Sequence, residues 1–470
     1  MKLSLRAIGP FILFGVICAA FAQADGLVPT IISRVVEHGI PSGAAMVILT
    51  VLAFAFMSVL SEYFGRSMRI EAFVLAIFLG VAGQDLLAPL ASNPDALTVV
   101  VNVSAAIILL QGGLEIKFEN FRKLFAVIGM LSLVGLFATA VFFSFTVLFI
   151  AEMVGVVMLP HVALLLGAIL ASTDPAALVP LFKKLNWLDE TARDVIIAES
   201  AGTDVTGTIL TLKLLGIVSA AGAAASFSVW NDGYAHVLTS EAAGNIALEM
   251  VIGAAAGYAG YVALRGLEWL KKRNGSDHGV DALAMKTIGL ASFFLAYFLH
   301  GSGFLAVFVA GLLYNVTGHM KSTEHKVGDY IDALFKPAVF VTLGSIVDID
   351  LLLQYAPLGI LAGLAFMLVN RPVAVFASLV WFRAFSAWAA ANGKRFDRIT
   401  DVSWKDMAFI ASVRETGAIP AVLLLAVKAS GVEGADMLVS VGTWVILLTL
   451  VFGPMYKPAL AEYFGIAKRA

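Results

Sequence analysis

Long apolar segments follow one another along almost the whole chain, and this feature limits the possible folds more than any other. A helix needs about 20 largely apolar residues to cross the hydrocarbon core of a bilayer. Of the residues, 60% are hydrophobic and only 14% are charged, whereas about a quarter are charged in a soluble domain. We therefore predict an all-α polytopic membrane protein with about 13 transmembrane helices. The predicted segments are 42–60, 69–89, 97–114, 123–152, 161–182, 194–217, 244–267, 281–300, 303–318, 331–349, 356–384, 405–429 and 437–463.

The residues before these segments resemble a secretory leader. Lys2 and Arg6 precede an apolar run, and residues 20–22 have the A-x-A pattern of a cleavage site. We predict a signal peptide at 1–23, with a retained extra N-terminal helix as the alternative. In either case the following chain starts outside.

The charge of the connecting loops alternates along the chain. Lysine and arginine gather in every second loop, whereas the loops near 91–96, 153–160, 218–243 and 348–355 contain neither. Because basic loops stay on the cytoplasmic side, we predict a multi-pass protein of the cytoplasmic (inner) membrane with a cytoplasmic C-terminus. The basic loop residues are Arg66, Arg69, Lys117, Arg122, Lys123, Lys183, Lys184, Arg193, Lys271, Lys272, Arg273, Lys321, Lys326, Lys394, Arg395, Arg398, Lys468 and Arg469.

Two segments carry polar residues and a proline inside an apolar stretch. Asp174 and Pro175 lie in the fifth segment, and Arg414 to Gly417, followed by Pro420, lie in the twelfth. Proline removes a backbone hydrogen bond, and lipid offers the freed groups no partner. The two segments are an odd number of crossings apart, so they would run through the bilayer in opposite directions.

Interrupted segments at matching positions of two inverted halves are typical of a transporter's binding site. We therefore predict an inverted 6+6 repeat with two broken crossing helices. The halves would be 42–217 and 281–463, with 244–267 as the linking helix. The alternative is that each proline only kinks its helix.

The sixth segment carries two acids and two hydroxyls within one and a half helical turns. An acidic residue at the centre of a membrane helix costs about 2.5–3.5 kcal/mol on insertion scales. Ser200 and Asp204 lie four residues apart and share a helix face. Glu199 and Thr203 are also four residues apart and share the adjacent face. Because hard oxygen ligands suit a hard cation or a proton, we predict an ion-binding wall. The alternative is an acid that a basic partner neutralises for helix packing.

Two arginines lie inside apolar segments and need anions, because arginine stays protonated. For Arg371 in the eleventh segment, Glu199 is the best candidate, and the pair would tie the two halves together. Arg414 could instead pair with Glu415 or Asp174, and the sequence leaves this choice open.

Two further polar residues lie near the ends of segments. Gln111 precedes a pair of glycines, so it could supply a carbonyl oxygen to a site, or the glycines could serve helix packing alone. Lys286 would extend its ammonium towards the membrane surface, as lysines near span ends commonly do.

Several classes of function have no support in the sequence. No phosphate-binding loop precedes a Lys-Ser/Thr pair, and no metal-ligand cluster or hydrolytic triad is present. We therefore predict neither an enzyme nor a bound cofactor. The net charge is −2 and no basic run favours nucleic acid as a partner.

At the Thr-Asp-Pro and Glu-Ser-x-x-x-Asp segments the chain resembles the monovalent cation:proton antiporter family, in its sodium/proton exchanger (NhaP-type) branch. The resemblance covers the whole membrane region. It implies 13 helices, an inverted repeat and a homodimer. A dimerisation domain (about 42–114 plus 281–349) would stay fixed while a core transport domain (about 123–217 plus 356–463) moves.

The resemblance also implies roles for single residues. Asp204 resembles the aspartate that binds ion and proton, and Ser200 and the Thr173 region resemble cation-coordinating oxygens. Glu199 with Arg371 resembles the internal salt bridge of the core.

Three positions complete this comparison. Asp174 resembles the acid that offsets the dipoles of the broken helices. The chain departs from the family pattern at Thr203, where an asparagine is usual, and at Gln111, where an acidic residue is common. Thr203 retains a hydroxyl that could still serve the ion site.

These features favour a secondary active transporter. It would exchange Na+, or else K+, for H+ by alternating access, with one-for-one electroneutral exchange at Asp204. One alternative is a transporter of another solute, such as an organic anion bound by Arg371 and Arg414. A second alternative is a membrane sensor or scaffold whose site no longer transports.

Overall fold

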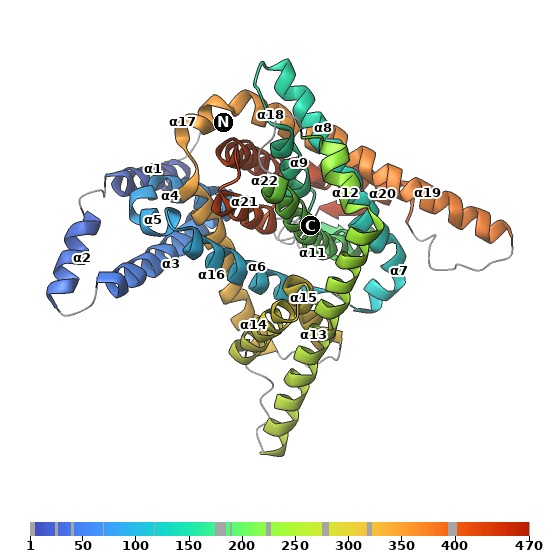
Figure 1. Cartoon of the computed structure of the whole chain (residues 1–470), viewed down its shortest axis with the longest axis horizontal. Helices are drawn as coiled ribbons and strands as arrows, with labels where there is room; N and C mark the ends of the chain where they lie inside the picture. The colour runs from blue at the N-terminus through green and yellow to red at the C-terminus, as the bar shows by residue number, and fades with distance from the viewer. Residues whose placement is uncertain are drawn as a thin grey trace.

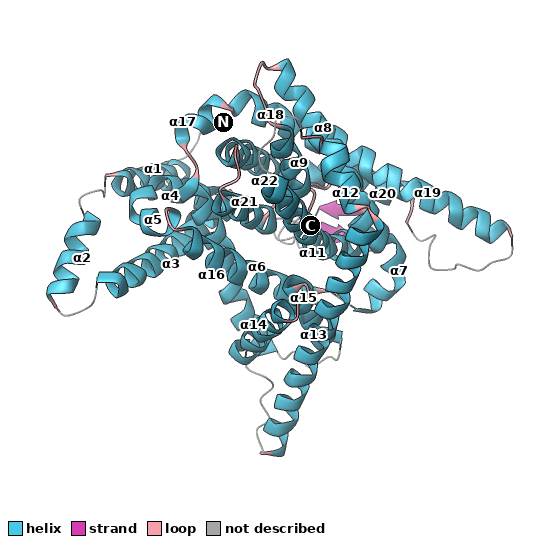
Figure 2. Ribbon diagram, viewed as in Figure 1, coloured by secondary structure: helices cyan, strands magenta, loops and turns pink. Residues whose placement is uncertain are grey.

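The computed structural model describes residues 5–23, 27–38, 42–68, 70–116, 118–173, 185–188, 190–221, 227–274, 282–316, 322–392 and 402–469. In these ranges the protein is almost entirely helical (Figures 1 and 2). One short antiparallel pair, β1 (Leu185–Trp187) with β2 (Ala467–Arg469), joins the connection before α11 (Thr191–Ala221) to the C-terminal end.

Each of the predicted segments contains a helix. By length and apolar composition, the described residues include 7 helices able to cross a membrane, or up to 8 spans if one bent pair is counted as one. Six shorter apolar helices accompany them, and the predicted number of crossings stays a prediction. The principal helices are α1 (Leu5–Ala22), α2 (Leu27–Glu37), α3 (Ser42–Met68), α4 (Ala72–Ala82), α5 (Gln84–Ala91), α6 (Pro94–Glu115), α7 (Phe118–Met130), α8 (Leu136–Met153), α9 (Pro160–Leu170), α11 (Thr191–Ala221), α13 (Ser240–Arg273), α14 (Ala282–Phe298), α15 (Gly303–Val316), α16 (Ser322–Ile346), α17 (Ile349–Gln354), α18 (Ala356–Ala365), α19 (Arg371–Ala391), α20 (Trp404–Ser412), α21 (Ala418–Ser430) and α22 (Ala435–Tyr463).

The predicted segment at 69–89 is sharply bent and does not form one straight helix. α4 and α5 meet at Gly83 with a bend of 87°. The side chain of Gln84, at the start of α5, donates to the carbonyls of Gly344 and Val347 near the end of α16. These distant hydrogen bonds hold the turn, and a pattern of apolar residues alone does not reveal them.

The helices form two groups that meet along α6, α11, α16 and α21 (Figure 1). In one group α3 and α4 pack with α16, and α6 packs with α15, which in turn contacts α13 and α14. In the other group α8 packs with α9, and α18 packs with α22. The predicted boundaries of a dimerisation and a core domain stay predictions.

Interruptions recur at corresponding places in the two halves. The fourth predicted segment contains a π-helical stretch, η1 (Leu131–Gly135), and the eleventh contains another, η3 (Phe366–Asn370). In the fifth segment α9 ends at Leu170, and in the twelfth the helix stops at Ser412 and resumes at Ala418. We call residues 171–173 the first break and residues 413–417 the second break. The predicted interruption at Asp174 and Pro175 lies outside the described residues.

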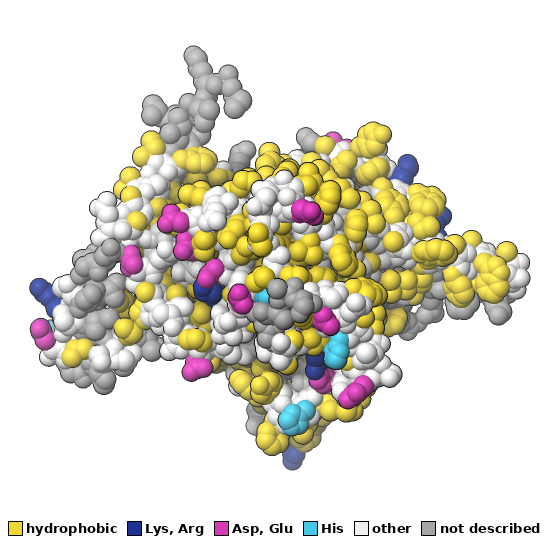
Figure 3. Space-filling view, turned by 45° about the horizontal axis from the view of Figure 1, so that its top comes forward, with side chains coloured by type: hydrophobic (Ala, Val, Ile, Leu, Met, Phe, Trp, Pro, Cys, Tyr) yellow, Lys and Arg dark blue, Asp and Glu magenta, His cyan; other side chains and the backbone are white. Residues whose placement is uncertain are grey.

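Apolar side chains are spread widely over the face shown in Figure 3. Large hydrophobic residues such as Phe298 and Phe149 are 80% and 64% exposed. A surface of this kind would associate in water, and it suits a chain whose helices face lipid.

Candidate functional site

The predicted ion-binding wall lies on α11, in the middle of the helix arrangement (Figure 1). Glu199, Ser200 and Thr203 are each 1% exposed, and Asp204 is 6% exposed. Because α11 is continuous, its backbone N–H and C=O groups form hydrogen bonds within the helix. Its side-chain hydroxyls can therefore form hydrogen bonds with the broken helix beside it.

Hydroxyls of α11 hold the first break. Ser200 donates its hydroxyl proton to the carbonyl of Thr173. The amide N–H of Thr173 donates to Oγ1 of Thr203 at 3.2 Å, and the two threonine hydroxyls lie 3.0 Å apart. Because chain that leaves a helix inside a membrane must find new partners for its backbone, these contacts fix the position of the break.

Thr203 therefore braces the first break. Its hydroxyl is 2.9 Å from the Ser200 carbonyl, to which it donates. The Thr203 side chain thus contacts both the backbone carbonyl of Ser200 and Thr173 of the first break. Its role as an ion ligand stays a prediction, as do those of Ser200 and Thr173.

Asp204 lies one residue beyond this brace. Its backbone carbonyl accepts a hydrogen bond from the hydroxyl of Thr208 at 2.7 Å. α11 also packs against α20 and α21, the helices on the two sides of the second break. The acid therefore lies on a helix that contacts both broken helices.

Glu199 and Arg371, which the sequence analysis pairs, are in contact. Nη1 and Nη2 of Arg371 donate to the two carboxylate oxygens of Glu199 at 2.6 and 2.8 Å. The remaining Nε donates to the carbonyl of Val413 at 3.1 Å, at the start of the second break. A bidentate, charge-assisted pair of this kind is strong and directional. It connects α11 with the second broken helix.

The π-helical stretch η1 packs against the same part of α11. The hydroxyl of Thr206 donates to the carbonyl of Ser132 at 2.7 Å, and Ser132 donates to the carbonyl of Glu199 at 3.3 Å. A π-helical turn alters the regular backbone pairing, and here side chains of the neighbouring helix complete it.

Arg414 joins the two breaks directly. Its Nη2 donates to the carbonyl of Leu170, the last residue of α9, and its guanidinium lies 4.4 Å from the ring centroid of Phe366. A cation at a helix C-terminus is stabilised by the helix dipole.

Among the described residues, Glu415 pairs with Lys457, so the suggested Arg414–Glu415 pair is wrong. The alternative partner, Asp174, lies outside the described residues.

Gly417 and Pro420 shape the restart of the second broken helix. Gly417 is the N-cap of α21, and Pro420 lies in the first turn. The N–H groups of a first turn have no partner within the helix, so proline is tolerated there.

The ion pair between Glu415 and Lys457 was missed by the sequence analysis. Both side chains are 0% exposed. The available signal was a lysine within the apolar thirteenth segment. Because Lys457 and Glu415 lie far apart in the sequence, the sequence does not indicate that they form a pair.

The prediction for Lys286 is also wrong. Its side chain is only 4% exposed, and its ammonium donates to Oε1 of Gln111 at 3.3 Å. Gln111, on α6, thus contacts a buried lysine of α14. Whether Gln111 also serves the ion site stays a prediction.

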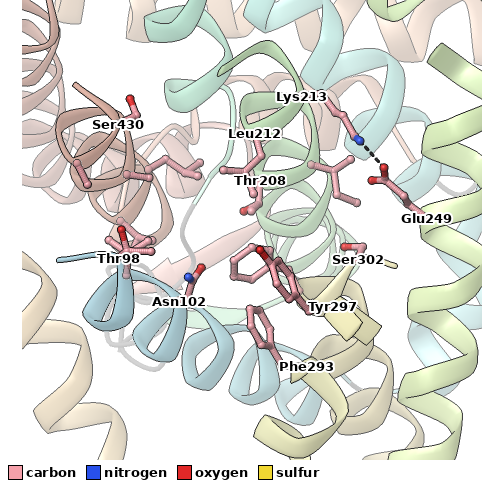
Figure 4. Close-up of a pocket in the computed structure, with 18 of the residues that line it drawn as sticks. Thr98, Asn102, Thr208, Leu212, Lys213, Glu249, Phe293, Tyr297, Ser302 and Ser430 are labelled. Carbon is pink, nitrogen blue, oxygen red and sulfur yellow. Dashed lines mark hydrogen bonds and ion pairs between the residues drawn. The ribbon is translucent and has the colours of Figure 1, made fainter. Parts of the chain in front are cut away.

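A cavity of about 440 Å³ lies between the two helix groups (Figure 4). Thr208 and Lys213 of α11 reach it from one side, and Asn102 of α6 and Tyr297 of α14 from the other. Lys213 forms an ion pair with Glu249 of α13 at its wall. Since Thr208 is four residues from Asp204, the cavity begins one helical turn from the buried acid.

The fold and these buried polar contacts define a multi-pass membrane protein in which two interrupted helices meet beside the buried polar residues of α11. A family model for the transmembrane part of sodium/hydrogen exchangers matches residues 66–462. The chain belongs to the sodium/hydrogen exchanger family.

Curated relatives are named as antiporters. The K(+)/H(+) antiporter NhaP of Alkalimonas amylolytica is 28% identical over 397 residues, which cover 82% of this chain and 61% of that protein. A probable Na(+)/H(+) antiporter of Methanocaldococcus jannaschii is 29% identical over 291 residues, or 58% of this chain and 63% of that one. The chain thus spans only about three fifths of their lengths.

A solved structure has the same fold. The sodium proton antiporter MjNhaP1 from Methanocaldococcus jannaschii, at pH 8, matches 89% of this chain and 100% of its own with a TM-score of 0.67 and 18% identity. The expected antiporter fold is therefore confirmed.

Proposed function

We propose that the protein is a secondary transporter that exchanges a monovalent cation, Na+ or K+, for H+. The observation that carries this proposal is the position of Asp204. It is a buried acid, one turn from a cavity, on an unbroken helix that packs against both broken helices. The names of the relatives include both ions, so the choice between them is part of the test.

The exchange follows from competition at one carboxylate. Asp204 binds either a proton or a cation, because both are attracted to the same oxygens and only one can neutralise the charge. The hydroxyl of Ser200, which contacts the first break, lies one turn away on α11. One charge exchanged for one charge makes the cycle electroneutral.

Two other buried acids of the described residues already have cationic partners. Glu199 is paired with Arg371, and Glu415 with Lys457. Both terminal nitrogens of Arg371 donate to Glu199. This engagement disfavours the alternative in which Arg371 binds an organic anion.

Alternating access requires one helix group to move past the other. The cavity between α11 and α21 on one side and α6, α13 and α14 on the other marks the surfaces that would slide. The core domain would move against a dimerisation domain that holds two copies of the chain together. The loop charges support a place in the cytoplasmic membrane with the C-terminus inside.

Proton flux in everted membrane vesicles tests the function. A pH-sensitive dye should report a signal when Na+ or K+ is added, and Asp204→Asn should abolish it while protein level and folding are retained. Asp350→Asn, at an exposed position on α17, is the matched control and should behave as wild type. Exchange retained in Asp204→Asn would refute the assignment. No response to any alkali cation in the wild type would favour another solute or a non-transporting member.

A further inference from the structure

A second carboxylate lies at the second break, with a lysine as its partner. Glu415 follows Arg414 in the extended residues between α20 and α21, and Lys457 comes from α22. Neither side chain is exposed, and their charged atoms are in direct contact. The proposed exchange at Asp204 uses neither residue.

A buried carboxylate cannot stay charged without compensation. Removing it from water is so unfavourable that it takes up a proton or a cation, unless a fixed positive charge is present. Lys457 supplies that charge, because its ammonium is in direct contact with the carboxylate of Glu415.

The backbone beside the pair leaves room for it. A Cβ atom on Gly453 would lie 2.4 Å from Oε1 of Glu415 and 3.0 Å from Nζ of Lys457. Any side chain at this position would displace one of the two charged groups. Gly453 is one turn before Lys457 on α22, so the helix that provides the ammonium also provides the space for it.

The surrounding contacts repeat those of the first break. The amide N–H of Thr416 donates to Oγ1 of Thr449 at 3.2 Å, and the two hydroxyls are 2.5 Å apart. The Thr173–Thr203 pair braces the first break in the same way. There, too, the hydrogen bond from the amide N–H of Thr173 to Oγ1 of Thr203 is 3.2 Å long. α22 thus braces the second break as α11 braces the first.

We propose that the second break contains a buried cation site at Glu415 that the ammonium of Lys457 fills permanently as a tethered cation. The chemical class of its occupant is a small monovalent cation, of which an alkylammonium is the closest free analogue. This inference deepens the proposed function, because a filled second site leaves Asp204 as the exchanging carboxylate. Its test does not depend on transport.

The test is rescue of stability by a free ammonium. Lys457→Ala removes the tethered charge and leaves space beside Glu415. We expect the unfolding midpoint of the purified protein to fall by roughly 5 °C or more, and methylammonium chloride to restore part of this loss. Choline chloride at equal ionic strength should restore none, because its cation is too large for the space. Methylammonium should not stabilise the wild type or Lys457→Ala with Glu415→Gln.

Two results would overturn the proposal. One is a Lys457→Ala protein as stable as the wild type. The other is stabilisation by methylammonium that is equal with and without the carboxylate of Glu415.

A second comparison applies if Lys457→Ala does not fold. Lys457→Met leaves an uncompensated carboxylate, whereas Lys457→Met with Glu415→Gln removes both charges at nearly constant volume. The double variant should unfold at a higher temperature than the single variant. If it does not, Lys457 does not serve to balance Glu415, and the proposal is wrong. Proton flux of the wild type separately decides whether the protein is an exchanger.

Discussion

At the scale of single residues, the hydroxyl of Thr203 braces the first break. Thr203 accepts the N–H of Thr173 and donates to the carbonyl of Ser200. A threonine in place of the asparagine that the resemblance implies therefore leaves the first break supported.

Replacement of Thr203 by valine should test this role. Valine has nearly the same shape but leaves the amide N–H of Thr173 without that acceptor, and a buried unsatisfied group costs about 1–3 kcal/mol. We expect a lower free energy of unfolding for Thr203→Val in chemical denaturation, and a smaller loss for Thr203→Ser. Thr287→Val, at an exposed position on α14, is the control. Equal losses at both positions would rule out a specific brace.

At the scale of elements, α11 contacts both groups of helices. Its first half holds the two breaks through Ser200 and Glu199, and its second half reaches the cavity. There Lys213 pairs with Glu249 of α13, and their side chains are 36% and 29% exposed (Figure 4). If α11 moves relative to α13 during exchange, this pair must separate once in each cycle.

Loss of the Lys213–Glu249 pair should shift the protein away from the present arrangement. A partly exposed pair contributes roughly 0.2–1 kcal/mol, which corresponds to a change of up to about fivefold in the ratio of the two arrangements. We would measure the labelling rate of Thr208→Cys by a polar maleimide in a Cys18→Ala background. Glu249→Gln should lower this rate, and the charge exchange Lys213→Glu with Glu249→Lys should restore it. An unchanged rate in Glu249→Gln would show that the pair does not favour the open cavity.

At the scale of the whole molecule, the alternation of loop charge predicts which ends of the helices face the cytoplasm. Val157 lies in a loop without basic residues and is 87% exposed, whereas Asn274 follows the basic end of α13. In intact cells with Cys18→Ala, an impermeant thiol reagent should label Val157→Cys and spare Asn274→Cys. Everted vesicles should give the opposite pattern. The same labelling pattern in both preparations would contradict the predicted topology.

The membrane class, the approximate positions of the helices and the pair of Glu199 with Arg371 can all be predicted from the amino-acid sequence. Transfer of apolar side chains from water to lipid depends on local composition, so a run of residues is enough to locate a span. A buried arginine requires an anion, and only a few acids lie inside the apolar segments. Local composition also indicated the second break, because polar residues interrupt an apolar stretch there.

The way in which distant segments pair with one another follows from the packing of the helices. The partner of Glu415, the burial of Lys286, the bend between α4 and α5 and the contact of Arg414 with α9 all depend on helices far apart in sequence. Inside a membrane each freed backbone group and each charge must find a partner. The sequence shows that a partner is needed, but the packing of the helices decides which residue it is.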